Sequence, residues 1–480
     1  MVAGLLVLVA LVAAIGVQRR SRAARMAATT AMLLAVALTG GITPAGAACT
    51  STTPPAAQVF SASVFKNGGA EPNVSISPSG KMVMIDGLGP ASPAALYRSS
   101  DFGHHFTRIS PTFTSSGGSD FDMRWIDDTH LIAADLSLQN GIYIHRSSDA
   151  GDHWTTTSVH TDTYDRPWID HFGADNVYLV SKGFDGIPYL FQSTDGGATF
   201  GAPPTPLLLY GLPNQGGPDV PSSFITNQNA YIDHLLVDQH SGGVYVLYGI
   251  DPGSTYSANQ PEGAPNQLYV AHLENGMMVS HPVQVGASDQ SCLGGFNWLT
   301  ADTAGTLYVL GNCRIAGRWS TWLSYSTDGA HNWSPLVDLG EAGASNVYGS
   351  IAGADAGKLS LIYLRGTNAD PSTAQDWFVR MATVTGANTA TPAVSRVQPI
   401  AGAMHTRDIC FDGILCGTVP PFGVDRNLLD YIWNAVGPDG TAYGIFCSDG
   451  PATGSTPGST PDVVLLRQES GPLIGRGVAS

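Results

Sequence analysis

The sequence predicts an all-β fold, and three observations support this prediction. The chain lacks helical periodicity, whereas short runs rich in Val, Tyr and Leu recur along it. The 57 glycines and 31 prolines are numerous enough to place turns between these runs. Only 12% of the residues are charged, which is typical of a turn-rich β protein rather than a helical one.

One sequence unit recurs seven times along the chain. Each unit has a short apolar strand, a tight turn with Gly or Asp, and a second strand. The first strands include residues 72–77, 125–126, 168–169, 234–237, 298–299, 348–351 and 430–433. No unit is large enough to bury both faces of its own sheet, so we expect radial stacking into a β-propeller of seven four-stranded blades. Six blades is the alternative. We expect residues 59–64 to supply the outer strand of the last blade and so close the ring.

Four units carry a further motif, Ser-x-Asp-x-Gly-x-x-aromatic or a close variant, in the turn after the third strand. The four copies span residues 99–106, 147–154, 193–200 and 326–333. The Asp carboxylate of such a turn accepts backbone N–H groups, Gly permits a positive φ, and the aromatic ring packs between sheets. We therefore predict a structural role for Asp101, Asp149, Asp195 and Asp328.

These four turns resemble the Asp-box, or bacterial neuraminidase repeat, of secreted sialidase-like propellers. The resemblance covers most of the chain after residue 47, and it implies a propeller but no single activity, because the same repeat builds sialidases, other glycosidases and non-catalytic binding propellers. Sialidases carry Arg-Ile-Pro ahead of the first box. Residues 48–98 contain no such motif, and the nearest dipeptide, Arg166-Pro167, follows two boxes.

The two faces of the predicted propeller differ in loop length. The turns between the first and second strands and between the third and fourth strands of each unit are short. The long segments all belong to the other connections, on the other face, at residues 201–228, 251–266, 366–375, 397–424 and 448–461. Long loops on a rigid scaffold usually carry binding and catalysis. The innermost strands begin on this face with polar residues: Glu71, Asp120, Asp122, Arg124, Asp165, Arg166, Asp233, His234, Asn297, Asn346, Asp425 and Arg426.

This polar set gives the candidate site. The candidate catalytic residues are Asp165, Asp425, Glu71 and Tyr431, the last two because a sialidase pairs a Tyr nucleophile with a Glu, and the first two as the acids of an inverting glycosidase. The candidate substrate-binding residues are Arg124, Arg166, Trp168, Asp233 and Arg426. The alternative is a set of Arg–Asp pairs that only neutralise one another.

The N-terminal segment predicts export. Four arginines precede an apolar run at residues 31–38 and the small residues Ala45-Gly46-Ala47, so residues 1–47 are expected to be a signal peptide. A membrane hairpin is the alternative, because residues 2–17 are also apolar. We expect a linker at residues 48–57, one propeller domain at 58–470 and a tail at 471–480.

Six cysteines in an exported chain favour disulfides over a metal site. Cys292 and Cys313 flank the hairpin of the fifth unit, so they are expected to pair. Cys447 occupies the corresponding place in the seventh unit and is expected to pair with Cys416 or Cys410. The remaining cysteine of that pair would then bond to Cys49 or stay free. A lipid anchor attached to Cys49 is a further alternative.

Charge narrows the range of partners. Without residues 1–47, 18 basic residues face 38 acidic ones, a net charge near −20, which argues against nucleic-acid binding. We expect a secreted monomer, or an outward-facing anchored one, that binds a carbohydrate or cell-surface glycoconjugate. Glycan or protein binding through the loop-bearing face is the first hypothesis, and a glycoside hydrolase is the alternative. No cofactor is expected, with structural calcium left open.

Overall fold

The computed structural model describes residues 57–87, 95–110, 120–137, 141–159, 163–183, 187–201, 203–207, 230–250, 267–286, 291–411, 416, 425–428 and 430–477. They belong to one compact unit, Ala56–Ser480. The expected signal peptide and Cys49 lie outside the described residues. No helix in the described ranges is long and apolar enough to span a membrane.

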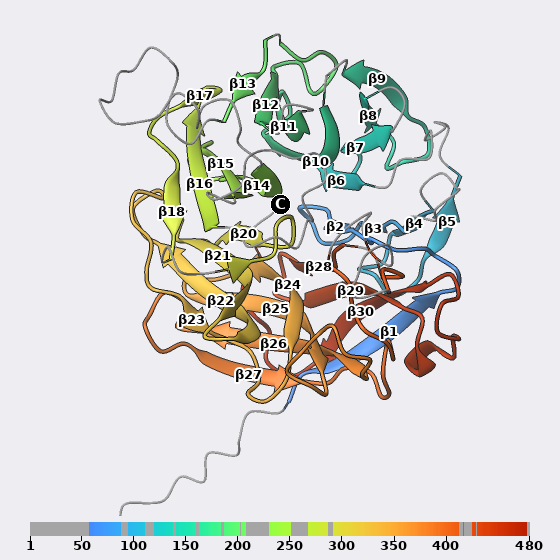
Figure 1. Ribbon diagram of the computed structural model, residues 1–480. Coiled ribbons are helices and arrows are strands. Elements are labelled where there is room, and N and C mark those ends of the chain that lie inside the picture. Colours follow the sequence, from blue (N-terminus) through green and yellow to red (C-terminus); the bar gives the residue numbers. More distant parts are fainter. Residues whose placement is uncertain are drawn as a thin grey trace, which may run out of the picture. The chain divides into compact units, whose positions relative to one another are not determined.

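Seven antiparallel sheets form the molecule, and each is a blade (Figure 1). Blade 1 comprises β2 (Val74–Ile76), β3 (Val83–Ile85), β4 (Leu96–Ser99) and β5 (Thr107–Ile109). Blade 2 comprises β6 (Phe121–Trp125), β7 (Leu131–Ser137), β8 (Gly141–Ser147) and β9 (Thr155–Val159). Blade 3 comprises β10 (Thr163–Phe172), β11 (Asn176–Gly183), β12 (Pro188–Ser193) and β13 (Thr205–Pro206). Blade 4 comprises β14 (Ala230–Val237), β15 (Val244–Ile250), β16 (Gln267–Glu274), β17 (Met277–Met278) and β18 (Val283–Val285). Blade 5 comprises β19 (Ser291–Cys292), β20 (Trp298–Ala301), β21 (Leu307–Ile315), β22 (Arg318–Ser326) and β23 (Val337–Asp338).

Blade 6 comprises β24 (Asn346–Gly353), β25 (Lys358–Gly366), β26 (Trp377–Thr385) and β27 (Ala393–Val397). Blade 7 comprises β28 (Trp433–Val436), β29 (Ala442–Ser448), β30 (Asp462–Ser470) and β1 (Val59–Phe65). Among the described residues, a 3₁₀ turn lies at Pro451–Thr453. The innermost strands β2, β6, β10, β14, β20, β24 and β28 contact one another in turn around the centre, and β28 contacts β2. The predicted seven-bladed propeller is therefore confirmed.

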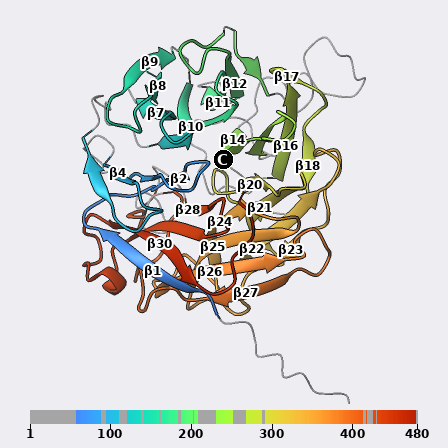
Figure 2. The ribbon, with the colours of Figure 1, turned by 180° about the vertical axis from the view of Figure 1, so that it is seen from behind.

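The ring closes through strands from the two ends of the described chain. β1 pairs antiparallel with β30 over the full length of β1, with Val64 opposite Val464 and Phe65 opposite Val463. The two strands lie side by side in both views (Figure 2). This confirms that residues 59–64 complete the last blade.

Inner strands are buried on both faces because each blade packs between two others. β15, with the sequence VYVLYGI, is buried at every position, as β-branched and aromatic residues in a fully covered strand should be. Outer strands are more polar and more exposed; β1 shows no buried position. The inner strands are thus rigid supports for the residues at their ends.

The four Ser-x-Asp turns share one hydrogen-bond pattern. The Ser Oγ donates to the Asp Oδ1 at 2.7–2.9 Å, and the backbone N–H four residues after the Asp donates to the same carboxylate at 2.8–3.0 Å. In the fourth turn, Ala330 adopts a φ of 68° where the other three have Gly. Because the first and third strands of a blade run in the same direction, these turns lie on the face opposite the starts of the inner strands. We call their side the turn face and the other side the mouth.

The structure confirms one predicted disulfide and corrects the other. Cys292 and Cys313 pair directly across β19 and β21 and form a disulfide. Cys410 bonds to Cys416, and Cys447 is a buried free thiol, so the predicted Cys447 pairing is wrong. Cys447 lies near the end of β29, opposite Val463, but both of its expected partners are bonded to each other. Cys410 and Cys416 are only six positions apart in the sequence, and their Cα atoms lie 5.9 Å apart.

Candidate active site at the mouth of the central channel

Five charged residues from five blades gather where the inner strands begin. We call them the mouth cluster: Glu71, Asp120, Arg166, Asp233 and Asp430. Each is at most 6% exposed. Charged side chains are rarely buried to this extent unless they are paired or serve a function.

Arg166 lies across the channel and joins three blades. Its Nη1 donates to the carbonyl oxygen of Gly295 in blade 5 at 2.7 Å, and its Nη2 pairs with Asp430 Oδ2 beside blade 7 at 2.9 Å. The guanidinium lies 5.4 Å from the ring centre of Phe296. A Cβ on Gly295 would lie 2.6 Å from Arg166 Cζ, so the arginine requires glycine at that position.

The backbone at two mouth residues is strained. Arg166 and Glu71 have φ values of 48° and 50°, in the left-handed region that costs a residue with a side chain about 1–2 kcal/mol. The N–H of Arg166 is held by Asp120 Oδ2 at 3.1 Å. Such strain is maintained only where the surroundings fix the conformation, and it often accompanies function.

Asp430 is bound by two arginines. Besides Arg166, Arg426 Nη2 donates to both oxygens of Asp430, at 2.9 Å and 2.8 Å. Both oxygens therefore accept charge-assisted hydrogen bonds, which are stronger than neutral ones. The cluster has one carboxylate neutralised in this way and three further acids around it.

Glu71 experiences the opposite environment. Burial raises the pKa of Glu71 well above its ordinary value, and the nearby charges of Asp430 and Asp120 raise it further; Arg166 and Arg426 oppose this only in part. Its Oε2 has no hydrogen-bond partner among the described residues. Glu71 is therefore a buried carboxylic acid that holds a proton at a pH where ordinary glutamates do not.

Two other residues at the mouth, Tyr431 and Asp233, have similar properties. Burial raises the pKa of Tyr431 well above 10, with the charge of Glu71 as the next cause, and within the described part of the chain the hydroxyl finds no hydrogen-bond partner. Burial also raises the pKa of Asp233 to about 7, although Asn297 donates two hydrogen bonds to its Oδ1. Asp233 Oδ2 and Trp168 Nε1 also lack a described partner.

Aromatic rings pack beneath the mouth cluster. The Trp168 ring lies 5.3 Å from Tyr431 and 5.6 Å from Trp433, and Trp298 lies 4.4 Å from Trp433. His234 lies 4.6 Å from Trp298, and burial lowers its pKa well below the ordinary value. This layer gives the polar cluster an apolar floor and a low local dielectric.

Arg124 belongs to a different part of the channel. It pairs with Asp122 on its own strand, its Nε lies 4.0 Å from Asp170 Oδ1, and its guanidinium lies 5.2 Å from the Trp433 ring. Burial raises the pKa of Asp122 to about 6 despite the arginine. Arg124 and Asp170 line a cavity of about 60 Å³ with His234, Trp298 and Trp433.

Asp425 lies in a cluster of its own. Its Oδ2 is 2.5 Å from Arg407 Nε and 3.9 Å from His405 Nε2, and His405 Nδ1 is 2.7 Å from Asp449 Oδ1. Burial lowers the pKa of His405, but the hydrogen bond to Asp449 and the nearby charges raise it to a greater extent. His405, Asp425 and Asp449 are close enough to hold a cation. Because Arg407 already places a positive charge on Asp425, we assign no metal there.

The structure thus brings together Glu71, Arg166, Trp168, Asp233, Arg426 and Tyr431 from the predicted set. The side chain of Asp165 lies outside the described residues. Sequence reasoning did not select Asp430 as a site residue, and it missed Gly295. Asp430 stands directly before the apolar residues of its unit, so its position in the repeat could have identified it.

Comparisons with known proteins give no family. No protein-family model matches the chain, and no curated protein sequence matches it. Solved structures that resemble it include a protein of unknown function from Dyadobacter fermentans, at 14% identity and a TM-score of 0.40, covering 86% of this chain and 97% of that chain. An α-L-arabinofuranosidase from Fusarium graminearum has 12% identity, a TM-score of 0.39 and coverage of 72% and 97%. A xyloglucanase from Xanthomonas campestris has 15% identity, a TM-score of 0.42 and coverage of 70% and 46%. We draw no functional argument from these similarities.

Proposed function

We propose that the chain is a carbohydrate-active propeller that hydrolyses a glycosidic bond at the mouth, with Glu71 as the proton donor. The observation that carries this proposal is the buried Glu71 carboxyl, whose pKa is raised and whose Oε2 has no partner in the described structure. A general acid needs a pKa near the working pH. A purely structural acid would be expected to have its oxygens satisfied.

Glycoside hydrolysis needs a second carboxyl group besides the donor. Asp120 and Asp430 are the candidates, because the charges of both act on Glu71. In the proposed reaction, the Glu71 proton passes to the leaving oxygen as the C–O bond breaks. Water then adds to the sugar carbon and loses a proton to a carboxylate, which balances the reaction.

Substrate binding is assigned to neighbouring groups. Arg166 and Arg426 supply positive charge at the mouth, the Tyr431 hydroxyl and Trp168 N–H are free to bond to sugar hydroxyls, and the aromatic floor excludes water. An acidic sugar would use the arginines most fully. The two disulfides fit the proposal that the protein works outside the cell.

The test is hydrolysis of a panel of aryl glycosides that includes an aryl sialoside. The parent protein should cleave at least one member, and Glu71→Gln should reduce kcat by about 10²–10⁴-fold, the usual contribution of a general acid. Asp328→Asn, on the turn face, is the control and should keep the parent rate. Full activity of Glu71→Gln would overturn the role of Glu71.

Glycan binding without cleavage is the second candidate. The observation that favours it is the engagement of Asp430 by both arginines, which leaves that carboxylate committed to ion pairs. In that case no panel member is cleaved, and a sugar binds the parent with an affinity that Arg426→Ala weakens.

A further inference from the structure

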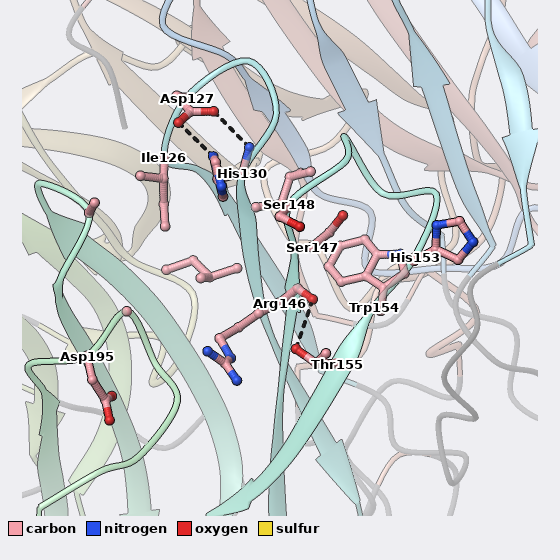
Figure 3. Close-up of a pocket in the computed structure, with 14 residues that line it drawn as sticks. Ile126, Asp127, His130, Arg146, Ser147, Ser148, His153, Trp154, Thr155 and Asp195 are labelled. Carbon is pink, nitrogen blue, oxygen red and sulfur yellow. Dashed lines mark hydrogen bonds and ion pairs between the residues drawn. The ribbon is translucent and has the colours of Figure 1, made fainter.

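A second pocket lies on the turn face, between blades 2 and 3 (Figure 3). Its volume is about 520 Å³, within the range of pockets that bind small molecules. The β6–β7 turn with Asp127 and His130 forms one wall, β8 with Arg146 forms the floor, and the turn of blade 3 with Asp195 forms the other wall. It lies on the opposite face from the mouth cluster and shares no residue with it.

Arg146 is the unusual residue of this pocket. Its guanidinium forms no ion pair and no hydrogen bond with any described residue, and its Nε is buried. Figure 3 shows its side chain extending from β8 toward the turn that carries Asp195. Asp195 does not pair with Arg146; its carboxylate accepts hydrogen bonds from Ser193 and Thr199, with acceptor capacity left over.

The neighbouring blade interface shows what Arg146 lacks. Arg98 has the same place in blade 1, directly before the Ser of the Ser-x-Asp turn, and it pairs with Asp152 of blade 2 at 2.9 Å. The residue that corresponds to Asp152 in blade 3 is Ala198. In both turns the backbone N–H of this residue donates to the backbone carbonyl oxygen of the turn's Asp, at 3.4 Å. Arg146 is therefore left unpaired where Ala198 replaces an acid, and the space between the blades is open there.

The lining suits a neutral, hydroxyl-rich ligand. Arg146 offers donors, and the carboxylates of Asp127 and Asp195 at the walls offer acceptors. Trp154 adds an aromatic surface, whereas the two carboxylates oppose a strongly anionic ligand. A sugar of one or two rings combines hydroxyl groups with apolar ring faces and fits this volume.

We propose that this pocket is a sugar-binding site, separate from the mouth, in which the guanidinium of Arg146 donates to sugar hydroxyls. It requires no reaction and does not depend on hydrolysis at the mouth. A protein with both sites would hold a glycan on one face while the other face acts on the same or a neighbouring chain.

The experiment is saturation-transfer NMR with maltose, cellobiose, lactose and chitobiose at about 10 mM, a concentration that fills a site of millimolar Kd. It uses the variant Glu71→Gln, so that no probe is consumed at the mouth. At least one disaccharide should bind. Adding Ala198→Asp, which supplies the missing acid for Arg146, should weaken that binding at least tenfold while the fold is kept. Adding Arg146→Ala should do the same.

The matched control is Arg98→Ala, which removes the equivalent arginine one blade earlier and should leave the affinity unchanged. The proposal is overturned if none of the four disaccharides binds, or if the affinity survives both Ala198→Asp and Arg146→Ala. Hydrolysis of the aryl glycosides by Ala198→Asp alone should equal that of the parent. A failure at the mouth is thereby distinguished from a failure of this pocket.

Discussion

On the turn face, the carboxylates of Asp149, Asp195 and Asp328 are exposed or half-buried, and hydrogen bonds lower the pKa of each to about 2. At the mouth and in the channel, Glu71, Asp122 and Asp233 are buried, and burial raises their pKa values. The residue types are similar and the shifts are opposite. Donors aimed at a carboxylate stabilise its charge, whereas loss of water destabilises it. The turn face is therefore built for local stability, and the mouth retains groups that can exchange protons.

The largest expected difference between the two regions comes from removing an arginine from each. Arg166→Ala leaves Asp430 short of one partner and the other mouth acids without a buried counter-charge, so we expect a loss of about 3–5 kcal/mol in the free energy of unfolding. Arg98→Ala breaks an ion pair whose Asp152 side chain is 56% exposed, and should cost about 1 kcal/mol or less. Urea-induced unfolding of the two variants measures both; equal losses would contradict the comparison.

Steric fit at the mouth gives a smaller effect. Gly295 and Gly317 both have a φ of 79°, but a Cβ on Gly295 meets Arg166, whereas a Cβ on Gly317 meets nothing within 4 Å. Gly317→Ala should therefore cost only the backbone strain, about 1–2 kcal/mol. Gly295→Ala should cost a further ~1–3 kcal/mol, because Arg166 is held by blades 5 and 7 and has no room to retreat. Thermal unfolding would show the difference, and identical midpoints would mean that Arg166 adjusts freely.

The smallest effects are in the pH dependence, where the two regions should have opposite signs. The pKa of Asp195 is lowered to about 2, so its contribution to stability is present above pH ~4 and is lost as the pH falls toward 2. The pKa of Asp233 is raised to about 7, so its contribution is greatest below pH ~4 and declines as the pH rises toward 7. Asp233→Asn should make the decline between pH 4 and 7 shallower, because Glu71 and Asp122 still contribute to it, and Asp195→Asn should leave it unchanged. Denaturation curves of the parent and both variants, recorded from pH 2 to 7, would measure the free energy of unfolding at each pH and test these opposite trends.

The repeat explains what the sequence could predict. Seven copies of one unit predict seven blades, and the hairpin that places Cys292 opposite Cys313 predicts their disulfide. Cys410 and Cys416 both precede the first strand of the seventh unit, and no other unit has two cysteines there, so the repeat carries no information on their pairing. Applying the same logic to Cys447 therefore gave a wrong partner.

The candidate site was predicted in part for the same reason. Equivalent repeat positions bring Glu71, Arg166 and Tyr431 to one end of the channel, since inner strands start on one face. Which acid each arginine selects is decided by side-chain length and by the room that Gly295 leaves. Neither quantity is visible in a repeat pattern, so the pairing of Asp430 with both arginines could not be predicted. Arg426 turns toward Asp430, while its neighbour Asp425 turns toward Arg407.

The pairing of β1 with β30 has a consequence for how the chain is made. β1 is the first strand of the propeller in chain order and completes its last blade, so the nascent polypeptide cannot close the ring until β30 has been synthesised. Until then both ends of the growing arc expose strand edges with unpaired N–H and C=O groups, which are prone to wrong pairing with other chains. Keeping the chain extended until β30 is available, as export through a membrane does, would remove that hazard.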